Sequence, residues 1–142
     1  MTRGYAVERT IDASPEEVWA LLTDPAGYPD WNPSVVSLDG RIAEGEKIRL
    51  VSTVSPTRPF SLTVTALASP ARMVWADGMP LGLFRGVRTF LLRRDGATTR
   101  FSMREEFTGP LAPLIFRSIP DLTGSFQQFA DGLKRAAEAR VR

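Results

Sequence analysis

The C-terminal stretch from Pro110 to Arg142 limits the possible folds most, because its pattern predicts one long amphipathic helix. Its large apolar residues recur at spacings of four, three and four, which places them on one face of a helix. These residues are Leu122, Phe126, Phe129 and Leu133. Burying each is worth about 1.5–3 kcal/mol, but only under a broad apolar cover. We therefore expect a sheet to pack on this face.

Three prolines interrupt the first part of this stretch: Pro110, Pro113 and Pro120. Pro120 lacks an N–H and clashes with a preceding carbonyl, so a kink or break is expected near Ile119. A break would splay residues 114–116 away from the sheet and leave a gap. The alternative is two separate helices packed without a cavity.

Composition excludes several kinds of chemistry. The 142 residues fit a single domain, 1–142, and contain neither Cys nor His. Disulfides, thiolate zinc sites, Cys nucleophiles and imidazole bases are thus excluded. No phosphate loop, dinucleotide fingerprint or spaced metal ligands occur, so we expect no metal and no cofactor.

Charge and hydropathy bear on partners and location. The 18 basic residues are scattered among 16 acidic ones. Binding to nucleic acid is not expected, because a phosphate-binding face needs clustered Lys and Arg. No apolar run is long enough to span a membrane, and the N-terminus lacks a signal-peptide core. We expect a cytoplasmic protein without membrane insertion.

The chain before the C-terminal stretch has mainly strand character. After a first strand at Gly4–Ile11, Ser14 can cap a short helix whose Glu17 completes a capping box. A second short helix is expected in the tight, proline-rich stretch from Ala26 to Pro33, where the prolines forbid a long one. Further predicted strands are 34–38, 47–54, 60–67, 72–76, 84–94 and 98–108, with a loop at 55–58. The order predicts an α+β domain with about seven antiparallel strands and helices on one face.

Two segments resemble a known family. Residues 11–19, Ile-Asp-Ala-Ser-Pro-Glu-Glu-Val-Trp, and residues 28–33, Tyr-Pro-Asp-Trp-Asn-Pro, are similar to the opening of the SRPBCC or START-like superfamily in its polyketide cyclase/dehydrase branch. Residues 105–111 and 129–138 resemble that family's ending. The resemblance implies a helix-grip fold, in which a curved antiparallel sheet wraps a long C-terminal helix around a cavity. Family members bind lipids, sterols, hormones or polyketides there; some are cyclases and others bind proteins.

The segment 77–84 is unusually apolar for a connection between strands. Met79, Leu81 and Leu83 are expected to cap the core, to gate a pocket with Gly78 and Gly82 as hinges, or to contact a partner.

Arg88 and Glu105 are predicted to share the buried face of the last hairpin. If Asp95-Gly96 is a two-residue turn, Arg88 lies opposite Met103 and diagonal to Glu105. Two opposite charges on an apolar face need a reason. They form either a structural ion pair at the rim or a polar anchor for a ligand.

We therefore predict a hydrophobic or amphipathic ligand, such as a lipid, sterol or polyketide-like molecule, bound by a monomer or weak homodimer. One alternative is a cofactor-independent polyketide cyclase/dehydrase-like enzyme, whose catalytic residues the sequence does not identify. The other is a protein-interaction module with a filled cavity. Trp31 either lines the pocket mouth or pins its turn into the core. The predicted ligand-binding residues are Trp31, Trp75, Phe84, Arg88, Phe90, Met103, Glu105, Phe107, Ile115, Leu122 and Phe126.

Overall fold

Seven antiparallel strands form one sheet in the computed structural model, which describes residues 3–141. Their order across the sheet is β1-β7-β6-β5-β4-β3-β2. The strands are β1 (Arg3–Ile11), β2 (Val35–Gly40), β3 (Lys47–Ser52), β4 (Ser55–Ala68), β5 (Arg72–Gly78), β6 (Arg85–Asp95) and β7 (Thr98–Thr108). The helical elements are α1 (Pro15–Leu22), η1 (Pro25–Gly27), α2 (Tyr28–Trp31), η2 (Pro80–Gly82), α3 (Ala112–Ser118) and α4 (Thr123–Arg140).

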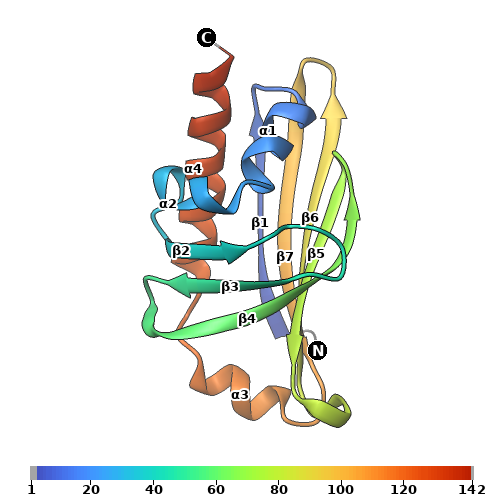
Figure 1. The fold of residues 1–142 in the computed structure, drawn as a ribbon, viewed down its shortest axis with the longest axis vertical. Coiled ribbons are helices and arrows are strands. Elements are labelled where there is room, and N and C mark those ends of the chain that lie inside the picture. Colours follow the sequence, from blue (N-terminus) through green and yellow to red (C-terminus); the bar gives the residue numbers. More distant parts are fainter. Residues whose placement is uncertain (1–2, 142) are drawn as a thin grey trace.

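The sheet is strongly bent around α4. In Figure 1, β1, β6 and β7 run along the molecule, whereas β2, β3 and β4 run across it. The short helices α1 and α2 follow β1 and lie on the same side as α4. The predicted helix-grip α+β fold, with its seven strands, is therefore confirmed.

The C-terminal stretch is two helices, so the prediction of one continuous helix is wrong. The break predicted near Ile119 is confirmed: α3 ends at Ser118 and α4 begins at Thr123. Ile119 has extended backbone angles (φ −84°, ψ 153°), as expected for a residue that precedes a proline. Figure 1 shows α3 diverging from α4 at the end of the sheet.

The apolar face of α4 packs on the sheet as predicted. Phe126, Phe129 and Leu133 are at most 3% exposed. The ring of Phe129 lies 5.3–6.3 Å, centroid to centroid, from the rings of four core residues. These are Tyr28, Trp31, Phe90 and Phe101. Leu122, at the start of the helix, is only partly buried.

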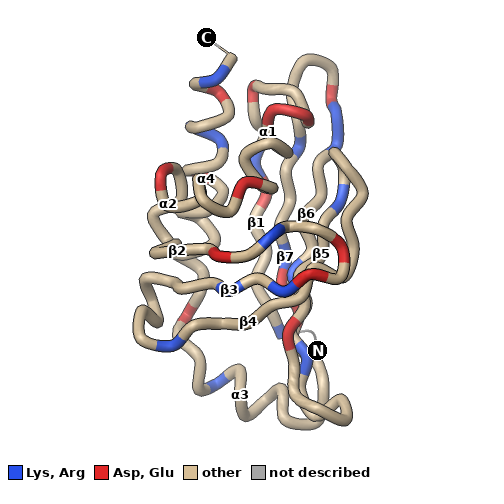
Figure 2. Tube along the Cα trace, viewed as in Figure 1, with Lys and Arg blue, Asp and Glu red and all other residues tan. Residues whose placement is uncertain are grey.

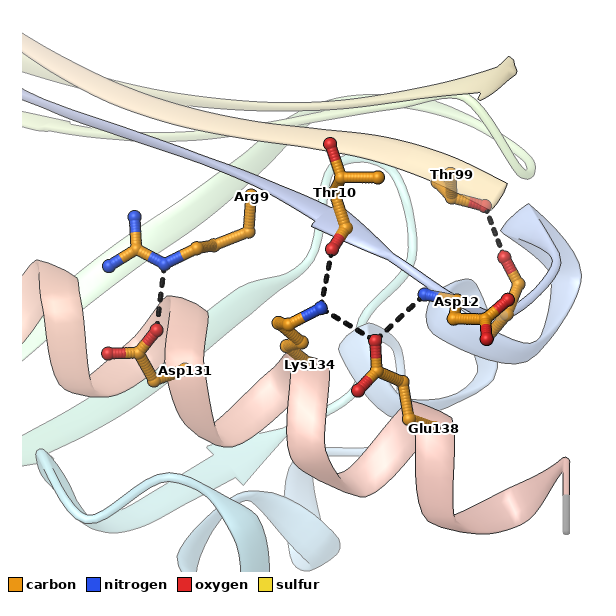
Figure 3. A network of polar contacts seen from close by, with 8 residues as sticks. Arg9, Thr10, Asp12, Thr99, Asp131, Lys134 and Glu138 are labelled. Carbon is orange, nitrogen blue, oxygen red and sulfur yellow. Dashed lines mark hydrogen bonds and ion pairs between the residues drawn. The ribbon is translucent and has the colours of Figure 1, made fainter. Parts of the chain in front are cut away.

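Polar side chains of α4 bind the outer edge of β1 (Figure 3). Lys134 Nζ donates to the Thr10 carbonyl and to Glu138, and the Asp12 amide donates to Glu138 Oε2. An edge strand presents backbone groups that no neighbouring strand pairs. Lys134 binds one such group, the Thr10 carbonyl, and Glu138 binds the amide of Asp12 just after the strand ends. Nearby, Arg9 donates to Asp131 at 2.7 Å, and this hydrogen bond lowers the pKa of the Asp131 carboxyl.

Two local predictions need correction. Ser14 Oγ accepts from the Glu17 amide at 3.2 Å. Among residues 3–141, however, the Glu17 side chain does not complete the capping box, and its Oε2 has no hydrogen-bond partner. The predicted loop 55–58 belongs to β4, because the turn falls at residues 53–54. The register between β3 and β4 shifts here, so that residues 56–59 have no partner on β3. The two prolines of β4, at positions 56 and 59, therefore interrupt no pairing with β3.

No helix among residues 3–141 is both long and apolar enough to cross a membrane.

Candidate functional site

A cavity of about 540 Å³ lies between the sheet, α3 and the start of α4. Its walls are mostly apolar and come from both layers: Leu50, Phe60 and Leu62 from β3 and β4, and Ile115, Phe126 and Phe129 from the helices. The break at Pro120 makes this space possible, because it lets α3 leave the line of α4. Residues 118–120 of the break are themselves part of the lining.

The register of the last hairpin differs from the predicted one. Asp95 pairs with Thr98, so the turn is Gly96-Ala97, and Gly96 takes the positive φ (62°) that favours glycine. Thr98 Oγ1 donates to the Asp95 carbonyl at 2.8 Å and closes this turn. Every pairing is therefore displaced by two residues along β7. An even displacement leaves each side chain on its predicted face.

Arg88 and Glu105 consequently lie directly opposite one another rather than diagonally. Arg88 Nε donates to Glu105 Oε1 at 3.1 Å, and each side chain is 14% exposed. The guanidinium carbon lies 4.8 Å from the centroid of the Phe126 ring, a cation–π distance. Trp75 is the partner of Arg88 on the next strand. The pair thus occupies the middle of the inward face of the sheet, and both residues line the cavity.

Most predicted ligand-binding residues lie around this cavity. Those in its lining are Trp75, Phe84, Arg88, Glu105, Phe107, Ile115, Leu122 and Phe126. The other three are in the core and outside the lining. Trp31 packs against the rings of Tyr28 and Phe129, while Phe90 and Met103 are at most 1% exposed. Of the two roles expected for Trp31, these contacts fit the one in which the residue holds its turn in the core.

Sequence reasoning missed several lining residues. Six serines are among the lining residues: Ser34, Ser52, Ser55, Ser61, Ser118 and Ser125. Arg58 lies in the bulged part of β4, which looked like a loop because of its prolines. Tyr28 also reaches the lining and donates to the Leu22 carbonyl at 2.6 Å. Burial raises the pKa of the Tyr28 hydroxyl above its ordinary value.

The apolar connection between β5 and β6 does not cap the core at its tip. Leu81 is 96% exposed and has a left-handed φ of 63°. Met79, at 43% exposed, and Phe84 line the cavity on either side of the tip. The Leu111 amide donates to the Leu83 carbonyl at 2.9 Å and joins the connection to the segment before α3.

In the part of the chain that the structure describes, no three acidic side chains come together as metal ligands would. Basic and acidic residues are interspersed along the described chain (Figure 2). Those of the cavity lining are Arg58, Asp77, Arg88 and Glu105.

Comparison with known proteins gives one family match. Residues 3–138 match the family model described as polyketide cyclase/dehydrase and lipid transport. A search of curated proteins finds no significant match.

Solved structures with the same fold are numerous. Protein MLL2253 from Mesorhizobium loti has a TM-score of 0.74 at 20% identity, over 99% of both chains. The Zhui aromatase/cyclase from Streptomyces sp. R1128 has a TM-score of 0.73 at 17% identity, over 100% of this chain and 97% of that one. A START superfamily protein from Mycobacterium smegmatis has a TM-score of 0.65 at 17% identity, over 97% and 96% of the two chains. At such identities the likeness shows a shared fold.

Proposed function

We propose that this chain, which belongs to the polyketide cyclase/dehydrase and lipid transport family, binds a hydrophobic or amphipathic small molecule in the cavity between the sheet and the C-terminal helices. The observation that carries the proposal is the cavity itself. Its volume of about 540 Å³ falls within the usual range of small-molecule sites. Its mostly apolar walls with a few polar groups are also typical of such sites.

The proposed binding residues divide by chemistry. Apolar and aromatic side chains remove the body of the ligand from water, at about 25 cal/mol for each Å² buried. They are Trp75, Phe84, Phe107, Ile115, Leu122 and Phe126. Arg88 and Glu105 are the proposed polar anchor, because they form the ion pair of the lining and stay partly exposed.

A cofactor-independent cyclase/dehydrase-like enzyme is the second candidate. The family description and the likeness to an aromatase/cyclase favour it. In such an enzyme the cavity would hold a flexible chain in a reactive conformation, and Arg88, Glu105 or ordered water would move protons. Incubation with a polyketide-like substrate, followed by mass spectrometry, distinguishes turnover from simple binding. A protein-interaction module with a filled interior does not fit a cavity of this size.

A ligand screen tests the proposed function. Fatty acids, fatty amides, sterols and aromatic polyketides are added one at a time, and the unfolding temperature is measured. A ligand at 100 times its Kd is expected to raise the free energy of unfolding by about 2.7 kcal/mol. Short DNA duplexes are the control and are expected to have no effect. If every small molecule leaves the transition unchanged, the binding function is contradicted.

Arg88→Met tests the anchor. The variant removes the guanidinium and keeps an apolar side chain, so we expect affinity for oxygen-bearing ligands to fall by about 1.5–3 kcal/mol. Titration calorimetry measures this change. Arg104→Met is the matched control, because Arg104 pairs with Glu106 and its side chain is 60% exposed. If Arg88→Met bound every ligand as tightly as the parent does, the role of Arg88 would be purely structural.

The cytoplasmic location and the monomeric or weakly dimeric state stay predictions from the sequence.

A further inference from the structure

The ion pair in the cavity uses only part of its hydrogen-bonding capacity. Within residues 3–141, the bond from Arg88 Nε to Glu105 Oε1 is the one side-chain hydrogen bond of either residue. A guanidinium has five N–H donors and a carboxylate has two acceptor oxygens. The two terminal nitrogens of Arg88 and the second oxygen of Glu105 therefore have no protein partner there.

These unpaired groups are accessible. Among residues 3–141, none of the fully buried side-chain atoms that lack a hydrogen-bond partner belongs to Arg88 or Glu105. Each of the two side chains keeps 14% of its surface exposed. Both residues line the cavity, and their strands place them side by side. Hydrogen-bond donors and an acceptor thus adjoin one another at the cavity wall.

The lining has no excess charge to attract an anion. It contains two arginines, Arg58 and Arg88, and two carboxylates, Asp77 and Glu105. A carboxylate or phosphate that approached Arg88 would also approach Glu105, whose negative charge is already paired with the same guanidinium. Juxtaposed like charges cost several kcal/mol at partly buried sites. A neutral group with a donor beside an acceptor meets no such repulsion.

Building on the proposed binding function, we propose that the cavity selects ligands whose polar group is uncharged and carries an acceptor next to a donor. A primary amide and an adjacent hydroxyl and carbonyl are groups of this class. The acceptor oxygen receives a hydrogen bond from a terminal nitrogen of Arg88, and the N–H or O–H donates to the second oxygen of Glu105. Glu105 is the specificity-determining residue, because its charge rejects carboxylates.

Two probes of nearly equal shape test this selectivity: 2-naphthamide, which is neutral, and 2-naphthoate, which is an anion at pH 7.5. Titration calorimetry with the parent protein is expected to give at least about tenfold tighter binding of the amide. In Glu105→Gln the repulsion is removed while an acceptor for Arg88 Nε remains. The naphthoate is then expected to gain at least about tenfold in affinity relative to the amide.

Glu106→Gln is the matched control, because Glu106 is the neighbouring carboxylate and pairs with Arg104 outside the cavity lining. It is expected to keep the parent's preference for the amide. The inference would be overturned if the parent bound the naphthoate as tightly as the amide, or if Glu105→Gln kept the parent's preference for the amide. Either result would leave the binding function intact. Absence of binding by both probes, to both the parent and Glu105→Gln, would contradict the inference and count against the binding function as well.

Discussion

Replacing Phe129 by alanine is expected to lower the free energy of unfolding by about 3–5 kcal/mol. Phe129 is 2% exposed, and its ring packs against rings from α2, β6 and β7. The smaller side chain leaves an apolar void that the bent sheet cannot close. Since a domain is stable by only about 5–15 kcal/mol, this loss is a large part of the total.

Urea denaturation followed by circular dichroism measures the effect of Phe129→Ala. Phe116→Ala is the comparison, because Phe116 is a partly buried aromatic residue on α3 rather than α4. Its loss is expected to be clearly smaller. A cost below about 1 kcal/mol for Phe129→Ala would mean that α4 does not organise the core.

Gly132→Ala is expected to destabilise the protein, although the same change in a helix normally stabilises it by about 0.5–1 kcal/mol. A Cβ atom at position 132 would lie 2.0 Å from the Trp31 carbonyl oxygen and 3.1 Å from its carbon. These are backbone atoms of α2, so α4 and α2 would have to separate. The close approach of the two helices thus requires glycine.

Gly124→Ala is the matched control on the same helix. An added Cβ there meets no atom within 4 Å, so a small gain in stability is expected. The free energies of unfolding of the two variants should therefore differ from one another by about 2–4 kcal/mol, with Gly132→Ala below the parent and Gly124→Ala above it. Similar thermal unfolding of both variants would show that α2 and α4 are not packed as described.

The elements with strong local signals were predictable from the sequence. The spacing from Phe126 to Leu133 predicts the buried face of α4, and Pro120 predicts where the C-terminal stretch breaks. The inward position of Arg88 and Glu105 also follows, even though the predicted turn was wrong. A displacement of two residues along a strand leaves each side chain on the same face of the sheet. The sequence therefore predicts the face of a residue more reliably than its partner on the next strand.

The rest of the site depends on contacts between distant segments. Serines such as Ser34, Ser61 and Ser125 line the cavity only because the residue before β2, strand β4 and helix α4 meet around it. Nothing in their local sequence distinguishes them from surface serines. Trp31, Phe90 and Met103, which the sequence predicts to bind the ligand, lie in the core outside the cavity lining. An apolar residue on an inward face can pack in the core or line a cavity, and only the placement of α3 and α4 decides between the two.

Native mass spectrometry of freshly purified protein tests whether the cavity is a binding site. We expect part of the protein population to carry an added small molecule, which organic extraction releases and mass spectrometry identifies as apolar or amphipathic. The variant Ser125→Phe, which fills the cavity from α4, is expected to fold and to lose this adduct. The variant Leu81→Ser, changed at the exposed tip, is expected to keep it. Protein that carries no adduct and takes up none of the screened ligands would contradict the claim that this cavity is a binding site.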